Sequence, residues 1–154
     1  MDEMIGYDEV AGRANELHAS LKTLGREWYL HSIVLCLRHG GKCGYCGIDL
    51  LSSYGICYHL WCLDHLLPQA KYPKLADDRE NHILACRPCN SIKGDFDPNG
   101  ASPAYCGTGR LTMQQRSQLF ASAKAYVCGK KERIEARFKE EVELLRPIVK
   151  SQTA

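Results

Sequence analysis

Apolar residues recur every three or four positions along residues 7–38, which is the spacing of one face of an α-helix. The clearest members of this pattern are Val10, Ala14, Leu17, Leu21, Ile33 and Leu37. Gly25 interrupts the pattern, and Gly40 and Gly41 follow its last residues. Because glycine favours helix ends over helix interiors, we predict two helices over residues 7–38, separated near Gly25 and ended by the glycine pair.

Residues 48–67 combine short apolar stretches with small residues that interrupt them. Aromatic and β-branched side chains are frequent here, namely Tyr54, Ile56, Tyr58 and Trp61. We predict a β-hairpin within this range. Residues 68–80 contain two prolines and a charged run, which predict a surface loop, and residues 81–85 then lead into a second apolar stretch.

The C-terminal half predicts helices. Pro88 suits the first turn of a short helix that Gly94 ends, so we expect a helix over residues 88–93. Residues 97–103 are rich in proline, glycine and polar residues and predict a linker. Thr112 can cap a helix that runs to Tyr126 and ends at Gly129. A last helix over residues 130–145 carries the apolar stripe Ile134, Phe138, Val142 and Leu145.

A length of 154 residues is enough for one domain with a hydrophobic core of ordinary size. The hydrophobic share of 45% and the charged share of 25% match an average soluble protein, which excludes the fibrous and disordered classes. No apolar run approaches the roughly 18 residues of a membrane span, and the first residues lack the pattern of a signal peptide. We therefore expect a cytoplasmic protein with no membrane partner.

Charge is unevenly distributed, although the net charge of +2 does not by itself indicate nucleic-acid binding. Residues 1–20 hold one basic and five acidic side chains, whereas residues 110–154 hold ten basic and five acidic ones. The C-terminal positive charge has two interpretations. The basic side chains of residues 110–154 either contact the backbone of a nucleic acid or lie on a solvated helix face.

Four of the nine cysteines form two matched pairs, Cys43 with Cys46 and Cys86 with Cys89. Two cysteines separated by two residues let one tight turn present both thiolates to a zinc ion, and two such turns complete a tetrahedral shell. The residues between the pairs must fold to bring them together. The sequence therefore predicts a zinc site held by these four thiolates.

A shell of four thiolates has no open position, so this zinc would be structural rather than catalytic. The other cysteines lack this spacing and are expected to pack in the core or near the surface: Cys36, Cys57, Cys62, Cys106 and Cys128. Cys57 and Cys62 lie inside the predicted hairpin and remain open as competing ligands.

Polar residues of chemical interest lie between and beside the cysteine pairs. Asp64-His65 precedes Pro68, Asn81 precedes the second pair, and Asn90 and Lys93 follow it. This ordered combination resembles the HNH endonuclease family, over residues 42–95. The resemblance implies an α+β fold, namely a ββα-metal (HNH) core with a four-cysteine zinc site formed by two CxxC knuckles, flanked by N- and C-terminal α-helices.

The candidate catalytic residues follow from the needs of phosphodiester hydrolysis. A neutral imidazole is well matched to removing a proton from water near neutral pH, so we assign the general base to His65. Asp64 is a hard oxygen ligand for a divalent cation such as Mg²⁺ or Mn²⁺. The resemblance implies that Asn90 is the second ligand of this ion and that Asn81 orients the base through hydrogen bonds. Lys93 and Arg87 are the expected phosphate contacts.

Asp64 and His65 raise a geometric problem, because adjacent residues on a regular strand point to opposite faces. We therefore expect the strand to end or bulge at this dipeptide, with Pro68 favouring an early end. Each candidate also has an ordinary structural explanation, such as a core histidine, a turn former, a cap or a solvated lysine. We expect structural roles for His59 and His82 and helix-surface positions for His18, His31 and His39.

The sequence thus predicts a metal-dependent DNA endonuclease in three parts. Residues 1–41 form an N-terminal helical extension, residues 42–98 the nuclease core, and residues 99–154 a linker and helices that pack on the core or on a partner. RNA stays open as a substrate, and a larger protein or a second copy as a partner of the flanking helices. The family resemblance implies a role in restriction, phage defence or a mobile element. The alternative is a zinc module that binds nucleic acid or protein without catalysis.

Overall fold

The first two helices form a pair at the N-terminal side of the fold. The computed structural model describes residues 5–152, in which α1 spans Tyr7–Thr23 and α2 spans Leu30–His39. Val10 and Ala14 of α1 pack against Ile33 and Val34 of α2 in a small core of their own. Gly40 caps α2 with a left-handed backbone conformation, at φ of 58°. The prediction of two helices ended by glycine is confirmed.

The predicted hairpin over residues 48–67 is wrong. Residues Tyr54–Leu60 form a helix, α3, whose first turn is capped by the Ser53 hydroxyl accepting the N–H of Ile56. Only Trp61–His65 is a strand, β1, and its antiparallel partner is β2, His82–Cys86. The pairing joins segments far apart in the sequence, so the local alternation of apolar residues did not reveal it.

Residues 66–81 connect the two strands and contain two short 3₁₀ turns, η1 (Pro73–Leu75) and η2 (Arg79–Asn81). The helix α4, Arg87–Lys93, follows β2 directly and ends at Gly94, as predicted. A further short helix, α5 (Pro98–Ala101), lies within the predicted linker, where the Asp97 carboxylate accepts the N–H of Asn99.

One long helix, α6, runs from Met113 to Gln152. The Thr112 hydroxyl caps its start by accepting the N–H of Gln115, as predicted. The predicted helix end at Gly129 is wrong. Glycine inside a helix costs only about 0.5–1 kcal/mol relative to alanine. Buried Leu119, Ala123 and Val127 keep the preceding turns packed on the domain, and the helix continues through Gly129 into its second half.

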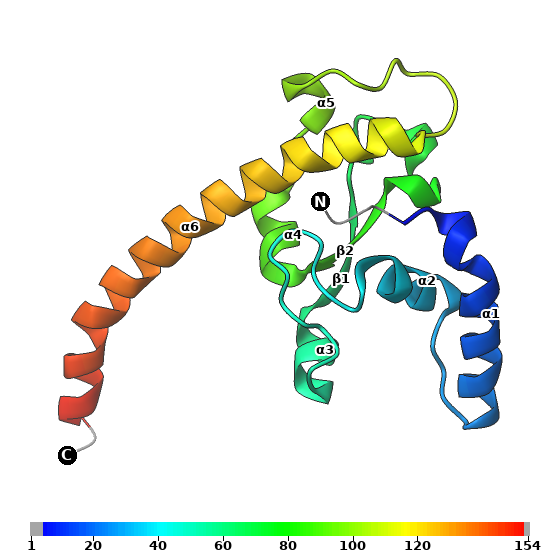
Figure 1. Ribbon diagram of the computed structural model, residues 1–154. Coiled ribbons are helices and arrows are strands. Elements are labelled where there is room, and N and C mark those ends of the chain that lie inside the picture. Colours follow the sequence, from blue (N-terminus) through cyan, green and yellow to red (C-terminus); the bar gives the residue numbers. More distant parts are fainter. Residues whose placement is uncertain (1–4, 153–154) are drawn as a thin grey trace.

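The main core lies around the two strands (Figure 1). α2 lies on one side of the strands and α4 on the other, while α6 crosses the domain and then extends away from it. Ile83, Leu84 and Ala85 of β2 are fully buried. They belong to one apolar cluster with Leu119 and Val127 of α6. Among residues 5–152, no helix is long and apolar enough to cross a membrane.

A buried ionic network joins the helices to the residues that precede β2. Arg38 of α2 donates to the carboxylate of Glu80 at 2.5 Å and to the carbonyl of Arg79 at 2.9 Å. Arg116 of α6, which is 1% exposed, donates to the carbonyl oxygens of Glu80 and His82. The network therefore fixes the start of β2 relative to α2 and α6.

Candidate active site and metal centre

The two cysteine pairs meet at one point. Cys43 and Cys46 lie in the turn after α2, Cys86 ends β2, and Cys89 lies on α4. Their sulfur atoms all lie within 4.8 Å of one another, and those of Cys46 and Cys86 are 3.7 Å apart. A tetrahedral zinc ion with Zn–S bonds of about 2.3 Å places its sulfurs roughly 3.8 Å apart. The four cysteines are therefore arranged as a zinc site.

The thiols of this cluster interact strongly with one another. Hydrogen bonds from the thiols of Cys86 and Cys89 hold the pKa of Cys43 far below its ordinary value. The reciprocal interaction with Cys43 raises the pKa of Cys86 to about 12 and also raises that of Cys89. The protein alone therefore stabilises one thiolate here, and four thiolates require a bound metal ion. Neither Cys57 nor Cys62 belongs to this cluster, which answers the question that their positions left open.

Asp64 faces α4 from the strand β1 and is only 5% exposed. One of its carboxylate oxygens accepts a hydrogen bond from the Tyr45 hydroxyl, and the other lies 3.5 Å from the ammonium of Lys93. Burial raises the pKa of Asp64, while Lys93 and Tyr45 act in the opposite direction by stabilising the carboxylate. The charge of this buried acid is thus supported by a cation and a hydroxyl donor.

Lys93 is itself buried, with 2% of its surface exposed. Besides Asp64, its ammonium contacts the backbone carbonyl of His65 at 2.7 Å. The helix α4 is thereby tied to the end of β1. The ammonium of Lys93 thus lies inside the protein. It could make the phosphate contact expected from the sequence only by leaving Asp64 and the His65 carbonyl.

Asn90 faces β1 from α4. Its amide nitrogen donates to the sulfur of Cys62 at 3.1 Å, which leaves the amide oxygen for another partner. Cys62 and Asp64 are two residues apart on β1, so their side chains share one face of the strand. Two oxygen donors, from Asp64 and Asn90, therefore flank the half-buried thiol of Cys62. Arg87, at the exposed start of α4, also acts electrostatically on Cys62 and lowers its pKa, although burial raises that pKa more.

His65 points to the other face of the sheet. The expected strand end or bulge that would aim both side chains of the Asp64-His65 dipeptide inward does not occur, because β1 continues through both residues, with Asp64 paired to Ile83 and His65 to His82 in regular register. The side chains of Asp64 and His65 consequently leave opposite faces of the strand. Their charges still interact, since His65 contributes to lowering the pKa of Asp64 against the effect of burial.

The hydrogen bonds of His65 define its tautomer. Its Nε2 lies 3.0 Å from the backbone carbonyl of Ala76 and 3.0 Å from the side-chain amide of Gln69. A carbonyl oxygen can only accept, so we assign the proton to Nε2 from the contact with Ala76; the amide nitrogen of Gln69 lies beside the same Nε2 and does not donate to it in this tautomer. This assignment leaves the Nδ1 lone pair of His65 as its basic site.

Asn81 is completely buried beneath the segment that follows His65. Its side-chain oxygen accepts the N–H of Leu67 at 2.7 Å, and its amide nitrogen donates to the carbonyls of Leu67 and Leu75 at 3.1 Å. Its own carbonyl accepts the N–H of Leu66 at 2.8 Å. Asn81 therefore fixes the path of the chain immediately after His65.

Comparison with known proteins agrees with this arrangement, because residues 43–96 match the family model of the HNH endonucleases. The chain carries an HNH domain. The matched range begins at the first zinc-site cysteine and includes β1, β2 and α4. No curated protein and no solved structure matches the chain. The family acts on nucleic acids with the help of divalent metals, which is the coarse assignment that the match supports.

Two histidines near the HNH site were missed as functional candidates in the sequence. His82 of β2 lies beside His65, with ring centroids 4.9 Å apart, and His31 of α2 lies on the other side of His82 at 4.9 Å. His31 is thus more than a helix-surface residue. The expected surface position of His39 is also wrong, since its Nε2 is buried and burial lowers its pKa to about 3. Only the strand register, which was not predicted, reveals the pair of His65 and His82.

Proposed function

We propose that this HNH domain is a metal-dependent endonuclease that hydrolyses phosphodiester bonds of DNA. In this proposal His65 is the general base, and Asp64 and Asn90 bind one divalent ion. One observation carries it: Asp64 shares one face of β1 with Cys62, Asn90 of α4 contacts Cys62, and His65 follows Asp64 at the end of the strand. The proposal places the attacking water beside His65 at the strand end and the ion beside Asp64 and Asn90.

The role of His65 depends on its Nδ1 lone pair. With the proton on Nε2 and donated to Ala76, Nδ1 is able to accept a proton from a water molecule that attacks phosphorus. His65 is only partly buried, which is consistent with access of that water. In this proposal the negative charge of the neighbouring Asp64 stabilises the imidazolium that this proton transfer forms.

The donor set of the second metal site suits Mg²⁺ or Mn²⁺, because a carboxylate and an amide oxygen are hard ligands. When bound there, such an ion would polarise a phosphoryl oxygen and stabilise the departing oxygen. Asp64 contributes its carboxylate to this site, where burial raises its pKa and Lys93 opposes that rise. Asn90 contributes its amide oxygen, because its nitrogen is directed to Cys62.

The remaining residues hold the substrate or the base. We propose that Arg87, which is exposed at the start of α4, contacts a phosphate next to the cleaved bond. Lys93 stabilises Asp64 and the strand end from inside the protein. Asn81 holds the segment after His65 in place and touches neither the ion nor the substrate.

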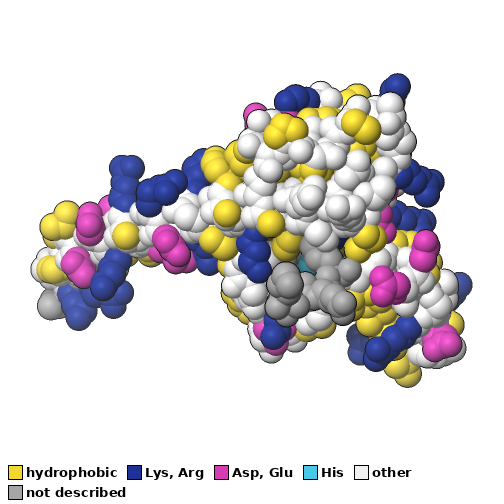
Figure 2. All heavy atoms as spheres, turned by 45° about the horizontal axis from the view of Figure 1, so that its top comes forward, with side chains coloured by type: hydrophobic (Ala, Val, Ile, Leu, Met, Phe, Trp, Pro, Cys, Tyr) yellow, Lys and Arg dark blue, Asp and Glu magenta, His cyan; other side chains and the backbone are white. Residues whose placement is uncertain are grey.

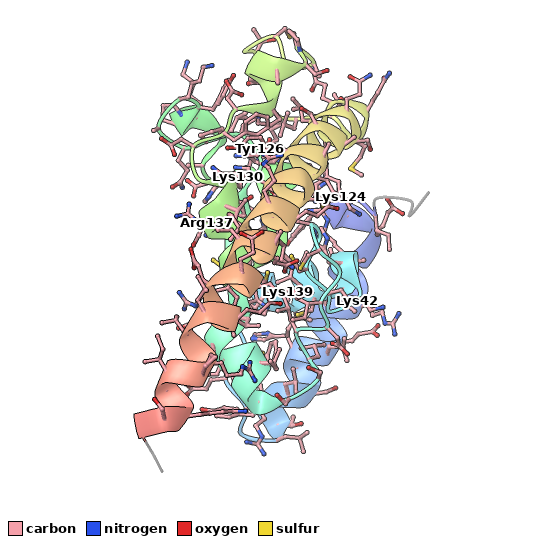
Figure 3. The ribbon with its side chains drawn as sticks, turned by 90° about the vertical axis from the view of Figure 1, so that its left-hand side faces the viewer. Lys42, Lys124, Tyr126, Lys130, Arg137 and Lys139 are labelled. Atoms are coloured by element: carbon pink, nitrogen blue, oxygen red, sulfur yellow. The ribbon has the colours of Figure 1, made fainter. Side chains whose placement is uncertain are left out.

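The long helix α6 offers a route for the nucleic-acid backbone. Figure 3 shows Lys124, Lys130, Arg137 and Lys139 along this helix. Acidic residues alternate with them, and Arg137 is already paired with Glu141 at 3.1 Å. We therefore assign α6 a supporting, salt-sensitive contact with DNA and leave the cleavage itself to the HNH domain. The family context suggests restriction, phage defence or a mobile element as the biological setting.

Plasmid nicking tests the proposal directly. The zinc-loaded protein is incubated with supercoiled plasmid, linear DNA and RNA in Mg²⁺ or Mn²⁺, with EDTA-treated samples as controls. We expect conversion of supercoiled DNA that depends on the added metal, and a rate loss of at least about a hundredfold in His65→Ala, as for loss of a general base. His59→Ala is the matched control, since His59 is an exposed histidine on α3. Equal rates for His65→Ala and the parent would refute the assignment.

One observation favours the second candidate, a zinc module that binds nucleic acid without cutting it. Asp64 and His65 leave opposite faces of β1, and Lys93 already neutralises Asp64. The binding module predicts retention of DNA in gel-shift assays with no cleavage under any divalent ion. It also predicts that His65→Ala and Asn90→Ala bind DNA as the parent does.

A further inference from the structure

We infer that His82, supported by His31, is a positioning residue that holds the imidazole of His65 in its base-competent orientation. The inference rests on the proposed role of His65 and extends it to two residues that are not among the proposed catalytic residues. His82 would touch neither substrate nor metal. It acts through the ring and the hydrogen bonds of its neighbour.

The strand register places His82 directly opposite His65 on the same face of the sheet. Their rings meet edge to face, with an interplanar angle of 88° and centroids 4.9 Å apart. His82 is 7% exposed, and the ring of the more exposed His65 packs against its buried ring. This packing contact restricts the rotation of the His65 side chain.

Both imidazoles also contact the same backbone carbonyl. Nε2 of His82 lies 2.8 Å from the oxygen of Ala76, and Nε2 of His65 lies 3.0 Å from it. A carbonyl oxygen has two lone pairs and can accept both N–H groups. His82 therefore helps to keep this oxygen where it assigns the His65 proton to Nε2, which leaves Nδ1 of His65 free.

His31 fixes the tautomer of His82 in turn. Nδ1 of His82 lies 2.9 Å from Nε2 of His31. Since Nε2 of His82 carries the proton donated to Ala76, its Nδ1 accepts, and His31 is the donor. Burial is the largest cause that lowers the pKa of His82 to about 4. His65 and His31 lower it further, whereas the hydrogen bond to Ala76 and the charge of Asp78 act to raise it. Burial and Arg38 lower the pKa of His31 as well. Near neutral pH the two supporting rings are thus uncharged, as this arrangement requires.

Three substitutions test the inference. His82→Phe keeps the packed ring but removes the donor to Ala76, His82→Gln keeps an N–H donor at a similar reach, and His31→Ala removes the donor to His82. We expect His82→Phe to lower kcat about tenfold to a hundredfold with little change in KM, because an unaligned base affects the transition state and not substrate binding. His82→Gln should recover most of this loss, and His31→Ala should show a smaller decrease.

Folding and tautomer state are measured on the same samples. Zinc content and thermal midpoint verify that each variant is folded, and His31→Ala serves where His82→Phe fails to fold, because His31 is the less buried of the two. Long-range ¹⁵N–¹H spectra of the imidazoles report tautomers without any need for activity. We expect the Nε2–H form for His65 in the parent and a mixture of forms in His82→Phe.

The outcomes separate the inference from the proposed function. If the parent cuts DNA and folded His82→Phe and His31→Ala cut with unchanged kcat, the positioning role is wrong while the nuclease stands. If no substrate is cut by the parent but the spectra show His65 losing its Nε2–H form in His82→Phe, the nuclease proposal fails and the positioning contact stands. An Nδ1–H form of His65 in the parent would overturn the inference whatever the activity.

Discussion

Lys93 contacts the carbonyl oxygen of His65 at 2.7 Å and the carboxylate of Asp64 at 3.5 Å, so that one buried ammonium connects α4 to both residues of the strand end. The relationship makes α4 and β1 a single unit. Asn90 on the same helix approaches Cys62 on the same strand, three residues from His65. The position of the proposed ligands and base therefore depends on Lys93.

Replacing Lys93 with methionine should destabilise the fold strongly. The change leaves the charge of Asp64 buried with only the Tyr45 hydroxyl as a donor, and removing one partner of a buried ion pair costs about 3–5 kcal/mol. Denaturant unfolding measures the loss. Lys74→Met is the control, because Lys74 is an exposed lysine in the loop between the strands.

The double substitution Asp64→Asn with Lys93→Met distinguishes a charge effect from a packing effect. It removes both charges of the pair, so we expect it to be less destabilised than Lys93→Met alone. A double variant at least as unstable as the single variant would show that the aliphatic part of Lys93, and not its charge, supports the site.

Removal of zinc should unfold the HNH domain. The metal would join the turn after α2, the end of β2 and the start of α4, which otherwise share few covalent constraints. Treatment with a strong chelator, or the substitution Cys86→Ser, is expected to abolish the cooperative thermal transition of these elements. Cys106→Ser is the matched control, since Cys106 is exposed and lies outside the thiol cluster. A chelated protein with an unchanged melting curve would show that the four thiols do not need a metal.

The site was predictable from the sequence where its signals are local. The cysteine spacing, Pro88 and Gly94 define the zinc site and α4 because ligand reach and helix ends depend on neighbouring residues. The strand pairing depends on residues that are distant in the chain, so the predicted hairpin gave β1 the wrong partner. Residues 54–60 form a helix instead of a strand, although they include strand-forming residues, and the Ser53 hydroxyl caps that helix. Contacts such as that of His31 with His82 have no local signature at all.

Stability should fall as the pH decreases from about 6.5 towards 4. The pKa of His82 is about 4 in the folded protein, below its ordinary value of 6.5, so the unfolded chain binds a proton in this range that the folded protein does not. The stabilisation from a neutral His82 is complete above pH 6.5 and is lost as the pH falls to about 4, and we expect a loss of about 1–3 kcal/mol. Thermal melts across this range measure it.

His82→Gln removes this titration, so the variant should lose less stability over the same pH interval than the parent. His59→Gln provides the control for a histidine at an exposed site. Acid also protonates the zinc-site thiolates, but this affects parent and variants alike, and the comparison is made at equal pH. Identical slopes for the parent and His82→Gln would contradict the buried, neutral state of His82.

The second half of α6 should be dispensable for folding. From residue 132 onwards its apolar side chains lie largely in solvent, with Phe138 63% and Leu144 74% exposed, whereas Leu119 and Val127 in the first half are fully buried. Figure 2 shows this half as an arm that projects from the domain and carries basic, acidic and apolar side chains together. Its helical state therefore depends on continuation from the packed half and not on contacts with the core.

We expect a chain ending after Ala136 to keep its zinc and to melt within about 2–4 °C of the full chain, a shift that corresponds to less than about 1 kcal/mol. This end point retains the Lys131–Glu135 ion pair. A chain ending after Gln118 is the contrasting variant, because it removes Leu119, Ala123 and Val127 from the core. It should fail to fold. A chain ending after Ala136 that loses zinc or melts far below the full chain would show that the arm packs on the domain in solution.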